Sequence, residues 1–273
     1  ATAPVYAEPG YLILVRNGRL LAQRFDAEKL KPVGDAMPLG EAPPGSGTAS
    51  APAVSVSSNG ILAHPAAGLP NTQLVWLDRA GRPQGTVALP PGRYSDVSLS
   101  PDDQRMVVSR QSSPTEMDLW MVEISRAVAT RFTFTSSPVI GNPLWSPDGQ
   151  WVAYNAFRGG PQDIYRKLAS GAGEEEPLLV SGALFKLLSQ WSWDGRSLLF
   201  DQPDPVSGWD VWLLPMEGER KPTPILKSRF NERYSQISPD GHWISYTSDE
   251  SGRNEVYVQS FPTPGSKYQV TTS

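Results

Sequence analysis

Apolar and polar residues alternate in short runs along almost the whole chain, as at Met106 and Val108 and again at Val152 and Tyr154. A period of two is typical of strands that bury one face. No long stretch has the i, i+3, i+4, i+7 apolar spacing of an amphipathic helix. The pattern therefore predicts an all-β chain with minimal helix content.

A four-residue turn signature recurs along the chain, and Ser146-Pro147-Asp148-Gly149 is its fullest copy. The equivalent final residues Asp103, Gly149, Gly195 and Gly241 follow one another at steps of 46 residues, and weaker copies in the same phase end at Gly60 and Gly10. Proline presets φ for the first corner of a type I turn, aspartate tolerates the second, and glycine accepts the left-handed conformation that follows. The spacing predicts six repeats, each with a tight turn between two strands.

Each repeat has the pattern of four strands. A bulky apolar column precedes the turn: Tyr6, Val56, Leu99, Trp145, Trp191 and Ile237. A second strand follows the turn, a third reads as in Asp163-Ile164-Tyr165, and a short fourth run follows, as at Arg131 to Phe134 or Pro177 to Val180. We expect one domain over residues 1–273, a six-bladed β-propeller with four-stranded antiparallel blades at about 1–51, 52–93, 94–139, 140–185, 186–231 and 232–273.

The phase of the repeat also predicts how the first and last blades meet. The first repeat begins with an inner strand near Tyr6, and the last ends with an outer strand near Tyr268. We therefore expect each terminal blade to be complete from its own segment. The two blades should then pack through side chains without exchanging a strand.

Composition removes several classes of function. The chain has no cysteine, which excludes disulfides, a thiolate nucleophile and Cys-ligated zinc. Its formal net charge of -4 argues against nucleic acid as a partner, because such partners require clustered lysine and arginine. The longest apolar run, Tyr11 to Val15, is far shorter than the ~20 residues of a membrane-spanning helix.

The Ser-Pro-Asp-Gly turn, followed after a strand by Asp-[Leu/Ile/Val]-[Trp/Tyr], resembles the signature of TolB-like propeller repeats over nearly the whole chain. Five segments are also similar to the C-terminal propeller region of certain bacterial transmembrane serine/threonine kinases: Tyr11 to Phe25, Gln73 to Arg79, Thr130 to Thr135, Gly171 to Glu176 and Ser251 to Pro262. This resemblance implies an extracytoplasmic, periplasmic sensor or interaction module that reaches the membrane only through a tether outside this chain. No kinase motif occurs, so no kinase activity is implied.

Related propellers also precede the hydrolase domain of prolyl-oligopeptidase-like serine peptidases. The Gly-x-Ser-x-Gly nucleophile motif does not occur, since after Gly195-Arg196-Ser197 the second glycine is replaced by Leu199. We therefore expect no enzyme activity from these residues. The alternative function is the gating propeller of a peptidase whose hydrolase domain lies outside them.

Other chemistry-bearing residues have structural explanations, and we expect no metal and no cofactor. The two histidines, His64 and His242, lack metal-ligand spacing, and both follow a turn. The repeated Asp102, Asp148, Asp194 and Asp240 are explained by hydrogen bonding within the turn. The third-strand residues Asp118, Asp163 and Asp210 are expected to bond backbone groups at strand ends. Among nine tryptophans, only Trp193 and Trp209 depart from the repeat.

The loops that lead into the inner strands vary from blade to blade, and this variation permits specificity. We expect them to form a funnel that binds a protein or peptide. The candidate residues are Arg93, Tyr94, Asp96, Asn142, Lys186, Asn231, Arg233 and Tyr234. The sequence leaves the ligand and the oligomeric state open.

Overall fold

The computed structural model describes residues 5–7, 10–16, 19–26, 29–41, 54–56, 62–65, 72–90, 92–113, 116–134 and 140–271. Strands are the only regular elements in these ranges, so the all-β prediction is confirmed. Within them, no helix is long and apolar enough to cross a membrane.

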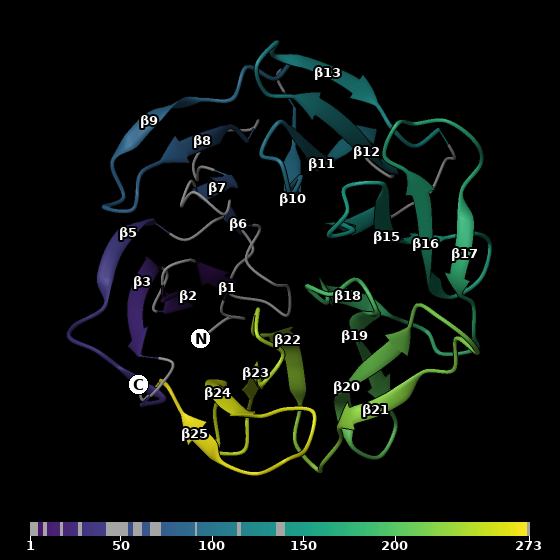
Figure 1. Cartoon of the computed structure of the whole chain (residues 1–273). Helices are drawn as coiled ribbons and strands as arrows, with labels where there is room; N and C mark the ends of the chain where they lie inside the picture. Colours follow the sequence, from purple (N-terminus) through teal and green to yellow (C-terminus); the bar gives the residue numbers. More distant parts are fainter. Residues whose placement is uncertain are drawn as a thin grey trace. The chain divides into compact units, whose positions relative to one another are not determined.

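Five four-stranded antiparallel blades follow the predicted pattern, and in each of them every strand pairs with the next one along the chain (Figure 1). Their strands are β6 (Ser55–Val56), β7 (Leu62–Pro65), β8 (Leu74–Leu77) and β9 (Pro83–Thr86); β10 (Tyr94–Leu99), β11 (Arg105–Ser113), β12 (Glu116–Glu123) and β13 (Val128–Arg131); β14 (Ile140–Trp145), β15 (Trp151–Phe157), β16 (Gln162–Leu168) and β17 (Glu176–Leu179); β18 (Leu187–Trp191), β19 (Ser197–Asp204), β20 (Gly208–Pro215) and β21 (Thr223–Leu226); and β22 (Glu232–Ile237), β23 (Trp243–Ser248), β24 (Glu255–Ser260) and β25 (Lys267–Gln269).

The prediction of six four-stranded blades is wrong, because the first repeat forms a five-stranded sheet. Its strands are β1 (Val5–Ala7), β2 (Tyr11–Arg16), β3 (Arg19–Asp26), β4 (Lys31–Pro32) and β5 (Met37–Glu41). The outer edge of β3 pairs with β4 at one end and with β5 at the other. Pro32 has no N–H to continue the ladder, and Gly34 follows with φ of 67°, so the outer strand is interrupted and split in two.

The fourth strands begin earlier in the chain than the apolar runs that predict them. Strand β13 ends at Arg131, where the predicted run begins, and β9 ends at Thr86. Residues of both strands are mostly exposed, whereas Val87 and Phe132, directly after them, are buried. An outermost strand is a sheet edge and needs no apolar side chains. At the start of each apolar run the backbone N–H still donates to the third strand, from Val87 to Leu74 and from Phe132 to Leu119, and the side chain is buried.

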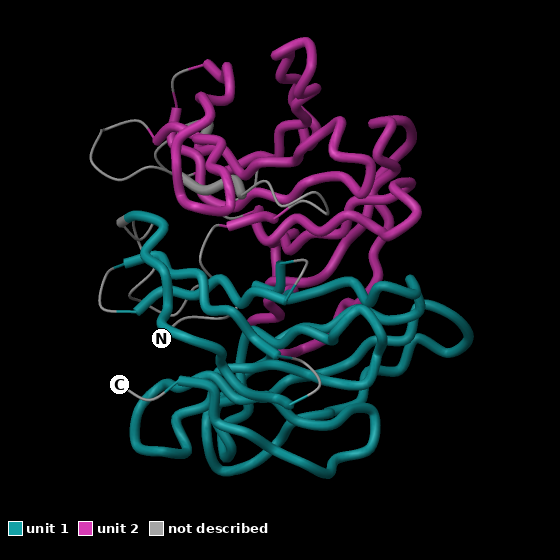
Figure 2. Tube along the Cα trace, turned by 60° about the vertical axis from the view of Figure 1, so that its left-hand side comes forward, with its two compact units in different colours: residues 1–52, 189–273 teal, residues 53–188 magenta. Residues whose placement is uncertain are grey.

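The chain divides into two compact units, one of residues 1–52 and 189–273 and the other of residues 53–188 (Figure 2). We call them the terminal unit and the central unit and describe each by itself. The assignment of residues 1–273 to one domain with the blade limits given above stays a prediction.

Paired aromatic residues recur where the second and third strands face each other. Tyr154 is opposite Tyr165 in the register of β15 and β16, with ring centroids 6.5 Å apart. Phe200 and Trp212 form the same stacked pair in β19 and β20, at 6.4 Å. Cross-strand aromatic pairs stabilise a sheet beyond the area they bury. The aromatic of the third strand therefore has a packing role in the blade.

The predicted turn chemistry is present in all four fully described turns. In the first of them, the Ser100 hydroxyl donates to Asp102 at 2.6 Å and accepts from the backbone N–H of Arg105 at 2.9 Å. The same Ser-to-Asp bond is made at Ser146, Ser192 and Ser238. The expected turns near residues 9 and 59 lie outside the described residues.

The apolar column before the turn packs between sheets. Trp145 is 6% exposed and its indole donates to the carbonyl of Ser98 in the preceding sheet, at 3.2 Å. Trp191 is 8% exposed and donates to Gly195 at 3.0 Å. The prediction that both indoles are almost fully buried is confirmed. Neither is available to stack on a ligand.

The first and last sheets meet inside the terminal unit without sharing a strand. Strand β1 pairs with β2, and β25 pairs with β24. Leu12, Phe25 and Leu30 of the first sheet form one apolar cluster with Val256, Val258 and Val270 of the last. In addition, the backbone N–H of Tyr6 donates to the side chain of Gln236 at 3.0 Å. The expected packing through side chains is confirmed and includes one hydrogen bond.

Replacing Trp191 by alanine should lower the free energy of unfolding by about 3 to 5 kcal/mol, because the substitution leaves a cavity in place of a buried indole. Trp193, which is 53% exposed, is the matched control. Trp193→Ala loses the hydrogen bond from its indole to the carbonyl of Ile237, worth about 1 kcal/mol. Urea unfolding measures both, and equal losses would contradict the packing role of Trp191.

Candidate functional site

The predicted funnel residues are divided between the two units. Arg93, Tyr94, Asp96, Asn142 and Lys186 belong to the central unit, and Asn231, Arg233 and Tyr234 belong to the terminal unit. The structure brings neighbours together within each unit.

In the central unit, Tyr94 and Lys186 are buried, and the polar group of each side chain is hydrogen-bonded. The Tyr94 hydroxyl donates to the carbonyl of Pro90 at 2.5 Å. Lys186 has no exposed surface, and its ammonium donates to Asp163 at 2.5 Å and to the carbonyl of Ala183 at 3.1 Å. These contacts hold the loops before β10 and β18 in place.

Asp96 and Asn142 lie together on neighbouring inner strands. The Asp96 carboxylate accepts from the backbone N–H of Asn142 at 3.4 Å and from the Ser95 hydroxyl at 3.2 Å. Asn142 has φ of 50°, at a bulge in the pairing of β14 with β15. Arg93 is exposed, and its guanidinium donates to the side chain of Gln111 at 3.4 Å.

In the terminal unit, Arg233 and Tyr234 lie at the start of inner strand β22 beside Trp209 of the preceding sheet. The Arg233 guanidinium carbon is 4.0 Å from the ring centroid of Trp209 and 4.4 Å from that of Tyr234. Arg233 is only 8% exposed. Cation–π contacts of a desolvated guanidinium are worth about 2 kcal/mol. They fix the plane of the guanidinium without using its N–H groups.

The polar atoms of this cluster are incompletely paired. Among the described residues, the Arg233 Nε and Nη2 atoms, the Tyr234 hydroxyl and one oxygen of Asp201 are buried without a hydrogen-bond partner. The other Asp201 oxygen accepts from the backbone N–H of Tyr234 at 2.9 Å and lies 3.9 Å from the Arg233 Nε. Buried polar groups are nearly always paired, so this concentration of unpaired groups marks the cluster as a candidate binding site.

Asp201 was not among the predicted site residues, although the repeat contains a signal for it. Six residues after the last residue of the turn, the chain has Ser109, Asn155, Asp201 and Thr247, all of them buried and polar. Asn155 accepts from the backbone N–H of Leu188 at 2.9 Å, as Asp201 does from that of Tyr234. A polar column inside an apolar strand could have been found by aligning the repeats.

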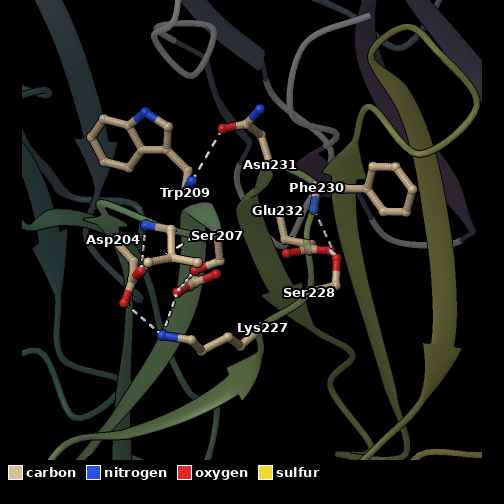
Figure 3. A network of polar contacts seen from close by, with 10 residues as sticks. Asp204, Ser207, Trp209, Lys227, Ser228, Phe230, Asn231 and Glu232 are labelled. Atoms are coloured by element: carbon tan, nitrogen blue, oxygen red, sulfur yellow. Dashed lines mark hydrogen bonds and ion pairs between the residues drawn. The ribbon is translucent and has the colours of Figure 1, made fainter.

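Asn231 belongs to a second polar network at the same end of the inner strand (Figure 3). Its carbonyl oxygen accepts from the backbone N–H of Trp209 at 3.1 Å, and its amide donates to Asp249 at 2.7 Å. Lys227, directly after β21, donates to Asp204 at the end of β19 at 2.6 Å and lies 3.4 Å from Asp210 of β20. Asn231 therefore connects the loops around the Arg233 cluster.

The third-strand acids are paired with cations, which the sequence did not predict, and Asp163 also accepts from the backbone N–H of Ser181 at 3.2 Å, as expected. Asp118 lies 2.8 Å from Arg131, Asp163 lies 2.5 Å from Lys186, and Asp210 lies 3.4 Å from Lys227. A buried acid requires a compensating charge, and a neighbouring arginine or lysine provides it in each of these three cases. Among the described residues, no group of three or more acidic or histidine side chains could hold a metal ion.

Burial raises the pKa of Asp201 to about 7, against the smaller opposing effects of the Tyr234 N–H and the Arg233 charge. The four turn aspartates have pKa values below the usual range, because each accepts a serine hydroxyl. Asp201 is therefore the acid whose environment differs most from the repeated pattern.

No protein-family model matches the chain. Its fold is similar to that of TolB from Acinetobacter baumannii, with a TM-score of 0.69 and 17% identity over 92% of this chain and 60% of that chain. The putative TolB from Agrobacterium tumefaciens gives a TM-score of 0.65 and 20% identity over 80% of this chain and 79% of that one. Puromycin hydrolase gives a TM-score of 0.61 and 14% identity, over 100% of this chain and 47% of that protein.

These similarities define the class of fold as a TolB-like β-propeller. The chain spans less than two thirds of the Acinetobacter TolB and about half of puromycin hydrolase. At such identities the fold is shared, whereas the function of either protein is a separate question.

Replacing Asp201 by asparagine should remove a dependence of stability on pH. An acid with a raised pKa in the folded state binds protons on folding, so it destabilises the fold increasingly as pH rises from about 4 to about 7. The stability of Asp201→Asn relative to wild type should therefore increase over this range, by up to roughly 4 kcal/mol. Urea unfolding at several pH values measures the difference.

Asp194→Asn is the matched control with the opposite sign. The pKa of Asp194 is lowered, chiefly by the Ser192 hydroxyl, so its contribution is present above the unfolded pKa and is lost as pH falls. A difference for Asp201→Asn that does not change with pH would show that its carboxyl is ionised throughout.

Proposed function

We propose that this chain is a non-catalytic binding module that engages a protein or peptide at the ends of the blades where the inner strands begin. One observation supports the proposal. The large apolar side chains that are most exposed lie mainly in the loops at these ends, whereas those of the inner and second strands are largely buried.

The strand order identifies these loops. An inner strand ends at the Ser-Pro-Asp-Gly turn, so the hairpin of the second and third strands and the connection to the next inner strand lie at the opposite end. In the central unit this end carries Phe134, Val180, Leu184 and Phe185, which are 68%, 62%, 68% and 42% exposed. In the terminal unit it carries Val206, which is 94% exposed. Exposed apolar groups that gather at one end of a blade are typical of binding surfaces.

The loop before β18 is held in a fixed shape that presents two of these side chains. Beneath it, Lys186 bonds the carbonyl of Ala183 and the carboxylate of Asp163. The Phe185 ring contacts Phe157 edge to face, with centroids 6.3 Å apart. A loop ordered before binding loses less entropy when a partner binds. Leu184 and Phe185 are thus presented as a preformed apolar contact.

The wider context of the module remains a proposal. The sequence resemblance supports an extracytoplasmic sensor joined to a bacterial kinase. The alternative is the propeller of a serine peptidase, favoured by the similarity to puromycin hydrolase and to prolyl endopeptidases, the latter with a TM-score of 0.60 and 16% identity over 99% of this chain and 43% of that chain. The flanking gene sequence separates them: a kinase with a membrane span supports the sensor, and a Gly-x-Ser-x-Gly domain supports the peptidase.

Peptides selected from a random phage library on the wild-type chain provide the test. Leu184→Asp should weaken their binding by about tenfold or more, because it puts a charge into an apolar contact. Val128→Asp is the matched control, since Val128 is 46% exposed in the same unit but lies on the hairpin of β12 and β13, at the turn end of its blade. It should leave the affinity unchanged.

Dissociation constants from calorimetry, with circular dichroism to confirm folding, decide the result. If no peptide is selected, or if both variants reduce binding equally, these loops are not the binding surface.

A further inference from the structure

Arg233 is a buried cation whose hydrogen-bonding capacity is largely unused. The side chain is 9% exposed, and among the described residues its Nε and Nη2 atoms have no hydrogen-bond partner. A guanidinium presents its N–H donors in a planar fork that matches a carboxylate. An unpaired buried donor destabilises the fold. Two such donors on one cation point to a ligand group.

The aromatic contacts orient the fork without occupying it. Trp209 and Tyr234 contact the guanidinium through their ring faces, at 4.0 and 4.4 Å from the centroids. The Tyr234 hydroxyl is itself buried and without a partner in the described part of the chain. Two guanidinium nitrogens and the hydroxyl of the tyrosine stacked on that guanidinium are therefore the unpaired donors of the cluster.

Asp201 does not neutralise this cation at hydrogen-bonding distance. Its nearer oxygen is 3.9 Å from the Arg233 Nε and accepts instead from the backbone N–H of Tyr234. The buried Lys186 provides a contrast, since its acid lies at 2.5 Å. Asp201 is therefore within ion-pair range of Arg233 but too far away to accept a hydrogen bond from it.

The cluster also departs from the repeat. The positions equivalent to Arg233 in the three preceding blades are Ser95, Gly141 and Leu187, and those equivalent to Tyr234 are Asp96, Asn142 and Leu188. A scaffold residue would be expected to recur, as the turn aspartates do. Arg233 and Tyr234 are thus specific to one blade.

We propose that Arg233 and Tyr234 form a subsite for a carboxylate of a peptide ligand, with the carboxylate bound by Arg233 Nε and Nη2 and by the Tyr234 hydroxyl. This inference rests on the proposed function in so far as the carboxylate belongs to a peptide. A singly charged carboxylate is favoured over a phosphate, because Asp201 lies beside the guanidinium and, when ionised, repels a doubly charged group more strongly than a singly charged one.

The test uses acetate as the probe and acetamide, its neutral isostere, as the control. In the wild-type protein, the NMR resonance of the Arg233 Nε–H should shift saturably with acetate, with a dissociation constant in the millimolar range that so small a ligand permits. Acetamide should cause no such shift. Absence of a saturable shift up to about 0.1 M acetate, or an equal response to acetamide, overturns the subsite.

Two variants assign the effect to the cluster. Tyr234→Phe removes only the hydroxyl and should weaken acetate binding about three- to tenfold, as expected for one hydrogen bond. Arg233→Lys keeps the charge but loses the fork, and should abolish saturable binding, observed in this variant by tryptophan fluorescence. Unchanged acetate affinity in both variants, with unchanged thermal unfolding, would place the bound acetate elsewhere.

Two further probes identify the source of the carboxylate. N-acetylalanine represents a peptide C-terminus, and N-acetylaspartate amide represents an acidic side chain. Tighter binding of either one than of acetate supports the subsite and assigns it, whereas weaker binding of both than of acetate would show that a peptide carboxylate does not fit. Acetate binding does not depend on any selected peptide, so failure of this titration leaves the Leu184 test intact, and the reverse also holds.

Discussion

The hydrogen bond from one sheet to the inner strand of the next is the interaction on which the arrangement of the candidate site depends. An inner strand pairs with only one neighbour, so its other edge carries backbone N–H groups that require acceptors. At the bulge of β22, the N–H of Tyr234 is satisfied by Asp201 at 2.9 Å, and Asn155 does the same for Leu188. The bulge turns the chain at the entrance of the strand and directs Arg233 toward Trp209.

Side chains of one sheet also accept from backbone N–H groups further along the inner strand of the next sheet. Ser55 accepts from the N–H of Leu99 at 3.0 Å, and Gln190 accepts from that of Ile237 at 2.5 Å. These two side chains lie one residue before the apolar column, so at both contacts a polar position lies beside a bulky one. Apolar packing supplies most of the stabilisation, while the hydrogen bonds fix the register of one sheet against the next.

The repeat explains what could be predicted from the sequence. Ser-Pro-Asp-Gly turns, strand alternation and the burial of Trp145 and Trp191 are local or periodic properties, and they appear in the structure as expected. The split outer strand of the first sheet depends on Pro32, in a repeat where the signature is weakest. Asp201 was missed because its carboxyl acts across sheets, and a single repeat gives no indication of which backbone N–H it will meet.

Lys186 and Arg233 show that residues which vary from blade to blade can be of two kinds, those that stabilise a loop and those that are free to contact a ligand. Both precede an inner strand or begin one, both are cations, and both are buried. The ammonium of Lys186 lies 2.5 Å from the third-strand acid of the preceding blade, an acid that recurs as Asp118 and Asp210. A cation paired with an acid of the repeat completes the scaffold and fixes the loop that carries Leu184. Arg233 faces an acid of the polar column that already accepts from a backbone N–H and lies 3.9 Å from the guanidinium, so two of its donor atoms have no partner among the described residues and remain for an external group. The difference between the two cations depends on the position of the acid in the repeat. An acid of the third strand pairs with Lys186, which shapes the binding surface, whereas an acid of the polar column leaves Arg233 able to contact the ligand.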